Sequence, residues 1–349
     1  MITVVGSFVM DMVARMERFP QAGETTIGQS VQYFPGGKGA NQCIAAARLG
    51  GKVRMAGMLG DDAYGRQFRQ LLDESGVDRT HVYSCDHPTA VAQVQINAEG
   101  QNRIVVIPSA NHAFGFEDLE KIDALLRDSE MIILQLEMRL DVTMEIIRRC
   151  HGYGVPVLLN PAPAVPLDSE ILGMVTYLTP NETELAILSG MPTDTLEQQI
   201  AAARHLNDLG VRTCIATLGE AGALVCTKEE CFVVPAYRVK AVDTVAAGDS
   251  FNGALAVALT EGKTMKEAVQ FANAMAGLTV QVAGAIPSLH TRAQVEEFIR
   301  TYPNTKCAQK TPPVWAAFFI FIRSAMQRQD LSWRHFWRGS DRQAASGRH

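Results

Sequence analysis

The segment whose residue types are best suited to carry out chemistry is 241–253, which reads AVDTVAAGDSFNG. Three small residues, Ala246, Ala247 and Gly248, stand where an apolar helix is expected to begin at Asp249. Small residues let an anion approach the backbone, where the unpaired N–H groups of a first helical turn attract it. A carboxylate beside that anion could accept the proton of an attacking hydroxyl group. The alternative interpretation is that Asp249 only caps the helix after a tight turn.

A second segment, residues 34–42, reads FPGGKGANQ and is rich in glycine. Its three glycines within four positions permit positive φ angles and a close approach of the backbone to a small polar ligand. Lys38 and Asn41 add side-chain donors suited to hydroxyl groups. The pattern predicts a binding loop for a hydroxylated molecule, with a flexible hinge before a helix as the alternative.

A third segment, residues 179–184, reads TPNETE and directly follows a strand-like apolar run. Asn181 and Glu184 are three residues apart, so they share a face at the start of a helix. An acid there could hold a hydrated magnesium ion that bridges phosphates. A helix whose first turn is simply capped is the alternative interpretation.

A framework of alternating strands and helices must position these segments. Apolar runs bounded by turn residues predict strands at residues 2–5, 53–58, 131–135, 155–159, 177–179, 214–217 and 223–226. Helical spacing of apolar residues predicts helices at 39–49, 61–75, 140–150, 196–209, 249–261 and 265–283. Because strands without polar alternation lie between helices, we expect an α/β fold: a doubly wound, mostly parallel sheet with helices on both faces.

A different pattern interrupts this framework. Residues 90–97 and 102–107 alternate in polarity around the turn 98–101, which predicts a β-hairpin. Residues 25–34 are also strand-like. We therefore expect a small β-sheet, formed from about residues 12–35 and 89–108, that stands off the main body as a lid.

The composition of the chain narrows the class of protein. Its 349 residues are 47% hydrophobic and 20% charged, with a net charge of −5. The chain therefore lacks the overall excess of basic residues that would indicate a nucleic-acid partner. No run of eighteen apolar residues could span a membrane, and the first residues lack the basic flank of a secretory signal. The seven cysteines are odd in number and scattered, which indicates reduced thiols in the cytoplasm.

The last part of the chain differs from the rest. Residues 303–349 contain eight Lys or Arg residues against two Asp, and all three tryptophans. We expect residues 1–302 to be the folded domain and residues 303–349 to be an atypical, poorly ordered basic and aromatic tail. A membrane-surface segment and a nucleic-acid contact are alternatives for this tail.

Four ordered motifs resemble one family. They are the GGKGAN stretch that ends at Asn41, the N-x-x-E at 181–184, the TLGEAG turn at 217–222 and the DTVAAGD stretch at 243–249. In order and spacing they are similar to the ribokinase group of the phosphofructokinase-B-type sugar kinases, and the resemblance covers residues 1 to about 300. It implies transfer of phosphate from ATP to the 5-hydroxyl of D-ribose, which gives D-ribose 5-phosphate and ADP.

The resemblance also implies roles for individual residues. Asp249 would be the catalytic base, and the amides of Ala246, Ala247 and Gly248 would form an anion hole. The positions that match sugar contacts are Val9, Asp11, Gly37, Lys38, Gly39, Asn41, Glu137 and Asp249. Those that match the nucleotide side are Asn181, Glu184, Thr217, Gly219, Gly222, Gly248 and Asn273, with Glu184 organising Mg²⁺ through water. Those that match the ligands of an activating K⁺ ion are Asp243, Val245, Thr279, Val282, Gly284 and Ser288. The lid implies a homodimer, and neither a nucleic acid nor a membrane is expected as a partner.

One departure from the family pattern concerns the sugar. Ribokinases commonly carry Asn two residues before the acid that matches Asp11, whereas this chain has Val9. A hydroxyl group buried against valine would lose a hydrogen-bond partner, while a sugar without that hydroxyl would not. A 2-deoxyribokinase, or another sugar kinase of the family, is therefore the alternative to ribose. A non-catalytic sensor on the same fold is more remote, because Asp249 and its small neighbours are present.

Overall fold

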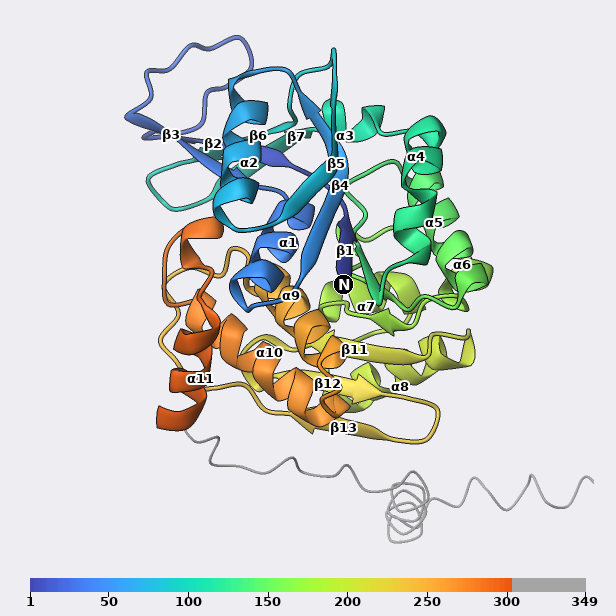
Figure 1. Ribbon diagram of the computed structural model, residues 1–349. Coiled ribbons are helices and arrows are strands. Elements are labelled where there is room, and N and C mark those ends of the chain that lie inside the picture. Colours follow the sequence, from blue (N-terminus) through green and yellow to red (C-terminus); the bar gives the residue numbers. More distant parts are fainter. Residues whose placement is uncertain (303–349) are drawn as a thin grey trace, which may run out of the picture. The chain divides into compact units, whose positions relative to one another are not determined.

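The computed structural model describes residues 1–302. They form an α/β fold in which a large, mostly parallel sheet lies between two layers of helices, next to a smaller sheet (Figure 1). This architecture confirms the doubly wound fold and the small second sheet that the sequence predicts. The prediction of a poorly ordered tail falls on residues 303–349, outside the described residues.

The large sheet has nine strands in the order β13-β12-β11-β10-β9-β8-β1-β4-β5. The strands from β11 to β5 are parallel, and β12 and β13 continue that edge in antiparallel pairing. The strands are β1 (Ile2–Val5), β4 (Val53–Gly60), β5 (Asp78–Cys85), β8 (Met131–Leu134), β9 (Val157–Leu159), β10 (Tyr177–Leu178), β11 (Thr213–Thr217), β12 (Ala223–Cys226) and β13 (Cys231–Val234).

The central strand shows why the apolar runs do not alternate with polar residues. In β1, Ile2 pairs with Val53 of β4 on one side and with Met131 of β8 on the other. Ile2 and Val4 pack into the core on one face of the sheet, and Val5 packs into the core on the opposite face. Since helices cover both faces, every position of the strand is buried.

The helices form one layer on each face of the sheet. One layer consists of α1 (Lys38–Arg48), α2 (Ala63–Glu74), α9 (Ala247–Thr260), α10 (Met265–Thr279) and α11 (Arg292–Thr301). The other consists of α3 (Ala110–Ala113), α4 (Phe116–Arg127), α5 (Leu140–Tyr153), α6 (Ser169–Leu172), α7 (Glu182–Ser189) and α8 (Leu196–Asp208). Two 3₁₀ turns are η1 (Gly219–Ala221) and η2 (Ile286–Ser288). None of the described helices combines the length and the apolar character that crossing a bilayer requires.

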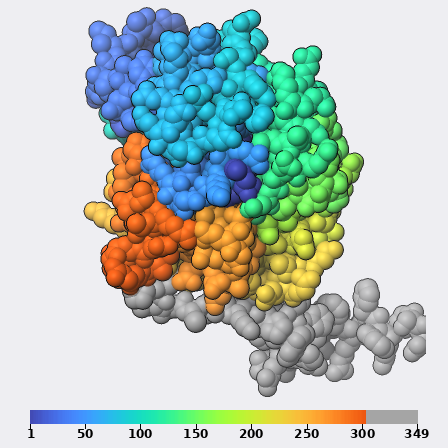
Figure 2. All heavy atoms as spheres, viewed as in Figure 1, coloured from blue at the N-terminus to red at the C-terminus, as the bar shows by residue number. Residues whose placement is uncertain are grey.

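The first of these layers brings distant parts of the chain together. Helix α1 packs against α9, and the blue atoms of the first part of the chain adjoin the orange atoms of the last helices in Figure 2. A Cβ atom at Gly253 would lie only 2.8 Å from the carbonyl oxygen of Gln42, so the glycine permits this close crossing. The crossing sets the N-terminal turns of the two helices next to each other.

The smaller sheet has the order β3-β2-β6-β7. Its strands are β2 (Val9–Arg15), β3 (Ser30–Gly36), β6 (Val91–Ile96) and β7 (Asn102–Ile107). The hairpin predicted at 90–107 is confirmed, because β6 and β7 pair in antiparallel register. The strand expected at 25–34 begins later, at Ser30, where pairing with Arg15 of β2 starts.

Two other expectations need correction. The helix expected to continue to residue 283 ends at Thr279, and the carbonyl of Val280 instead accepts hydrogen bonds from the amides of Val242 and Asp243. The expectation of reduced thiols fails for Cys226 and Cys231, which form a disulfide. These two residues face each other across the antiparallel pair β12–β13, with their Cα atoms 4.2 Å apart.

Candidate active site

The candidate site lies at the point where the order of the strands in the large sheet reverses. After β1 the chain adds β4 and β5 on one side of that strand, and it then adds β8 and β9 on the other side. The carboxyl ends of two such neighbouring strands leave a crevice between them, which is the usual ligand site of a doubly wound sheet. Ser7 follows β1 and Glu137 follows β8, and the Ser7 hydroxyl donates to Glu137 Oε2 at 2.5 Å.

The glycine-rich segment brings α1 up to this crevice. Gly37 has φ +87°, and a Cβ atom there would lie 2.6 Å from the backbone nitrogen of Val9. A Cβ atom on Gly39 would lie 2.3 Å from the backbone nitrogen of Ser7. Both glycines therefore allow the helix to start directly against the loop after β1, and the backbone N–H of Lys38 donates to Glu137 Oε2 at 2.9 Å.

The segment that carries Asp249 differs from the simple capping interpretation. Helix α9 begins at Ala247, and Ala246 precedes it in a left-handed conformation with φ +60°. Asp249 is therefore the third helical residue, and its carboxylate accepts hydrogen bonds from another helix, α1, rather than from its own backbone. Asn41 donates to Asp249 Oδ2 and Gln42 donates to Asp249 Oδ1, both at 2.9 Å.

Several charged side chains surround this buried carboxylate. Burial, together with the negative charges of Glu137 and Asp249, raises the pKa of Asp11 to about 6. Burial opposes the charged form of Lys38, but Asp249, Glu137 and Glu184 outweigh it and raise the pKa of the lysine. Lys38 thus lies among four carboxyl groups, Asp11, Glu137, Asp249 and Glu184, an arrangement rich in acceptors for hydroxyl groups.

One wall of the crevice is apolar. Val9 is 4% exposed and forms a small cluster with Ala90, Ala92 and Val94 of the second sheet. Asp11, two residues further along β2, lies on the same face of the strand, and its carboxyl group interacts with the negative charges of Glu137 and Asp249. The second sheet therefore offers a sugar-sized ligand both a carboxylate and an apolar surface.

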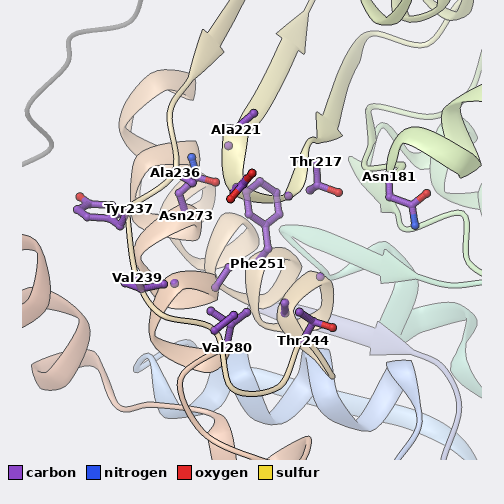
Figure 3. Close-up of a pocket in the computed structure, with 18 of the residues that line it drawn as sticks. Asn181, Thr217, Ala221, Ala236, Tyr237, Val239, Thr244, Phe251, Asn273 and Val280 are labelled. Atoms are coloured by element: carbon purple, nitrogen blue, oxygen red, sulfur yellow. The ribbon is translucent and has the colours of Figure 1, made fainter. Parts of the chain in front are cut away.

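A cavity of about 1110 Å³ adjoins the N-terminus of α9. Among its lining residues are six of the seven predicted for the nucleotide: Asn181, Thr217, Gly219, Gly222, Gly248 and Asn273. Figure 3 shows Tyr237 and Val239 at one end, Asn181 at the other and Phe251 between them. The sequence did not indicate Tyr237, Val239 and Phe251, because apolar residues in a loop and a helix carry no motif of their own.

The seventh residue, Glu184, lies on the same helix turn as Asn181. Asn181 Oδ1 accepts from the backbone N–H of Glu184, and Glu184 Oε2 accepts from the backbone N–H of Asn181. This reciprocal cap fixes both side chains at the start of α7 and leaves Glu184 Oε1 without a bond to the helix backbone. Glu184 is partly buried, and this burial raises the pKa of its carboxyl group.

The residues predicted to hold K⁺ come from two segments that Asp243 joins. Its Oδ1 atom accepts from the backbone N–H of Val245 at 3.0 Å, and its Oδ2 atom accepts from that of Gly284 at 2.8 Å. The Thr279 hydroxyl is buried and has no hydrogen-bond partner among the described residues. Oxygen atoms alone make up this set, as an alkali cation prefers. Within residues 1–302, no group of three or more His, Cys, Asp or Glu side chains could hold a metal ion.

Comparison with known proteins identifies related sequences and structures. The profile of the pfkB family carbohydrate kinases matches residues 1–292. Ribokinase of Bacillus subtilis is 39% identical over 302 residues, which cover 85% of this chain and 99% of that protein. Deoxyribokinase of Salmonella typhimurium is 37% identical over 300 residues, which cover 85% of this chain and 98% of that protein.

The fold matches solved structures of similar length. Arabidopsis thaliana ribokinase complexed with ribose and ATP superposes with a TM-score of 0.81 at 36% identity. The match covers 86% of this chain and 98% of that one. The ribokinase of Thermotoga maritima gives a TM-score of 0.79 at 38% identity, with 86% and 99% of the two chains covered.

Proposed function

The chain belongs to the pfkB family of carbohydrate kinases and is an ATP-using sugar kinase, and we propose that it converts D-ribose to D-ribose 5-phosphate. The observation that carries the proposal is the position of the buried Asp249 carboxylate, between the crevice at the ends of β1 and β8 and the large cavity. The crevice would hold the sugar and the cavity would hold ATP.

Asp249 is the proposed general base. The sugar 5-hydroxyl would place its proton on the free lone pair of an Asp249 oxygen while its own oxygen bonds to the γ-phosphorus. The bond from that phosphorus to the bridging oxygen breaks at the same time, and ADP leaves with the electron pair. Ala247 and Gly248 begin α9 beside the cavity, and a Cβ atom at Gly248 would meet nothing within 4 Å. This open N-terminal turn supports its proposed role in stabilising charge on the transferred phosphoryl group.

The sugar would be held by groups that already converge in the crevice. Asn41 Oδ1 is buried and has no hydrogen-bond partner among the described residues, so it can accept from a sugar hydroxyl. Asp11 and Glu137 offer further acceptors, and the Lys38 ammonium group offers donors, whereas the Gly39 N–H already donates to Ser7 Oγ. Several hydroxyl groups can thus be bound at fixed positions, which would orient the 5-hydroxyl toward Asp249.

A second candidate substrate is 2-deoxyribose. The apolar cluster of Val9, Ala90, Ala92 and Val94 favours it, because a sugar hydroxyl placed there would be buried without a partner. The 37% identity to a deoxyribokinase of Salmonella typhimurium is consistent with this alternative.

We also propose two cation sites. Magnesium would be held through water by Glu184 and by the phosphates of ATP, and it supplies positive charge that neutralises the phosphates. Potassium would be held by Asp243, the Ser288 hydroxyl and the carbonyls of Val245, Thr279, Val282 and Gly284. It supplies charge that fixes the loop before α9, and the two hydrogen bonds of Asp243 already draw the two ligand segments together.

The smaller sheet is the proposed lid and dimer contact. Its two edge strands expose large apolar side chains, each between 48% and 59% accessible: Val31, Tyr33, Ile104, Val105 and Val106. Exposed apolar residues concentrated on one small sheet are typical of a surface that another protein covers. A second copy of this chain is the occupant that the proposal names.

A coupled assay of ADP formation with ribose, 2-deoxyribose, fructose and nucleosides tests the proposed substrate. The highest kcat/KM is expected for ribose. A higher value for 2-deoxyribose would establish the second candidate, and a lack of ADP formation with any of these acceptors would contradict both.

A further inference from the structure

A network of buried side-chain amides lies behind the candidate base. Gln42 of α1 is fully buried, and Gln135 and Asn160 are only 2% and 7% exposed. Gln42 Nε2 lies 2.9 Å from Asp249 Oδ1 and 3.0 Å from Asn160 Oδ1, and Gln42 Oε1 lies 2.7 Å from Gln135 Nε2. None of these three amides has a role in the function proposed above.

One backbone carbonyl group determines which end of the Asn160 and Gln42 amides is the oxygen and which is the NH₂ group. The carbonyl oxygen of Thr179 can only accept, so Asn160 turns its NH₂ group toward it, at 3.2 Å. Asn160 Oδ1 then faces Gln42 and needs a donor, which only the NH₂ end of Gln42 supplies. That NH₂ group has two hydrogens, and it uses one for Asn160 and the other for Asp249.

Asn41 and Gln42, the two amides that contact Asp249, therefore differ in their other hydrogen bonds. Asn41 donates to Oδ2 and is 5% exposed, and its Oδ1 atom has no partner among the described residues, so a bound sugar would compete for its polar atoms. Gln42 donates to Oδ1 from the protein interior, where no ligand reaches it. Its other polar atoms are held by Asn160 and Gln135, so its position does not depend on substrate.

We propose that Gln42 is a positioning residue that fixes the rotation of the Asp249 carboxylate, so that one oxygen keeps a lone pair aimed at the sugar hydroxyl. The inference rests on the proposed role of Asp249 as general base. A carboxylate free to rotate would present that lone pair in only part of its orientations, and misplacement of a reacting group strongly lowers the rate. The close crossing of α1 and α9 at Gly253 keeps the two residues in register.

Two variants of Gln42 test the inference. Gln42→Met keeps the volume and removes the donor, and we expect kcat to fall roughly 10- to 100-fold. The KM values for sugar and ATP should change less than about threefold, because the groups that contact them remain. Thr3→Val is the control: Thr3 is fully buried in β1, and its hydroxyl is hydrogen-bonded to Ser129 at 2.7 Å, away from the site. This control should lose stability and keep kcat.

Gln42→Glu supplies a readout that a merely structural residue would not give. The new carboxyl group faces Asp249 Oδ1 and has a hydrogen to donate only when protonated. Its kcat, divided by that of the wild type at each pH, should therefore rise as the pH falls from about 8 to about 6. The charged groups that face Asp249 are Asp11, Lys38 and Glu184, together with the neighbouring Glu137. They are present in both proteins, so the ratio removes the pH dependence that the wild type already shows.

The outcomes separate this inference from the function on which it rests. Unchanged kcat in Gln42→Met, or a pH-independent ratio in Gln42→Glu, would overturn the role of Gln42. If Gln42→Met does not fold, the pH dependence of Gln42→Glu decides alone. Full activity in Asp249→Asn would instead overturn the assignment of the base.

Discussion

The side-chain amide of Asn41 lies 2.9 Å from Asp249 Oδ2 and so joins the first turn of α1 to the first turn of α9 across 208 positions of the chain. The glycine-rich segment and the small-residue segment each contribute one half of this contact. Neither half forms a site alone, because the acceptor for the sugar proton comes from one helix and its donors come from the other. The crossing of α1 and α9 is therefore what assembles the candidate active site.

Substitution of Val9 should change the choice of sugar. Val9→Asn places an amide where the apolar wall now stands, so a ribose hydroxyl would gain a partner worth about 1–3 kcal/mol. We expect kcat/KM for ribose to rise about fivefold or more relative to 2-deoxyribose. Steady-state assays with both sugars measure the ratio, and an unchanged ratio would show that Val9 does not face that hydroxyl.

Asp11 should limit stability at neutral pH. The pKa of Asp11 is about 6 in the folded protein, whereas its ordinary value is 3.8. Between these two pH values the folded state therefore binds more protons at this group than the unfolded state does. The stability that this group contributes is present below pH 3.8 and is lost as the pH rises through 6. Asp11→Asn should therefore be more stable at pH 7.5 by up to about 3 kcal/mol, with no gain near pH 4.

Denaturation at the two pH values measures this difference, and sugar binding by calorimetry accompanies it. The variant should bind sugar much more weakly, because it loses a carboxylate acceptor. Equal stability of the two proteins at pH 7.5 would contradict the raised pKa.

Potassium should stabilise the protein and activate it. Replacing Na⁺ by K⁺ at constant ionic strength should raise both kcat and the melting temperature, since a bound ligand stabilises the folded state. Asp243→Ala should remove both effects, because it loses the carboxylate that links Val245 to Gly284. A wild-type protein that responds equally to the two cations would refute the site.

The lid should hold two copies of the chain together. Val105 is 59% exposed on β7, and Val105→Asp would place a charge in the middle of the proposed contact. Sedimentation should show a dimer for the wild type and a monomer for the variant. A monomeric wild-type protein would rule out the dimer. Arg66→Asp, on the exposed side of α2 and outside the smaller sheet, is the matched control and should leave the association unchanged.

Much of the framework could be predicted because its strands are buried on both faces. The runs at β1, β8 and β11 contain no charged residue and are buried at nearly every position, as in a parallel sheet that is covered on both faces. Strand β5 was missed because it lies at the edge of the sheet, where the sequence DRTHVYSC leaves only Val82 fully buried. Its polar composition resembles that of a loop.

The site was predictable only where residues cluster in the sequence. Asp249 and the glycines stand in short motifs, so their positions could be inferred. The contacts of Gln42 could not, because Asp249 and Asn160 lie 207 and 118 positions away and only the folded chain brings them together. The same reason applies to Tyr237, which has no chemical motif and becomes a cavity residue only when its loop packs beside α10.

The central claim is that Asp249 removes the proton from a sugar hydroxyl that ATP phosphorylates. Asp249→Asn keeps the size of the side chain and removes the base, so the decisive measurement is kcat of this variant with ribose and ATP, with ribose binding measured in parallel. We predict that kcat falls at least about 100-fold while ribose still binds. A kcat close to that of the wild type would contradict the account.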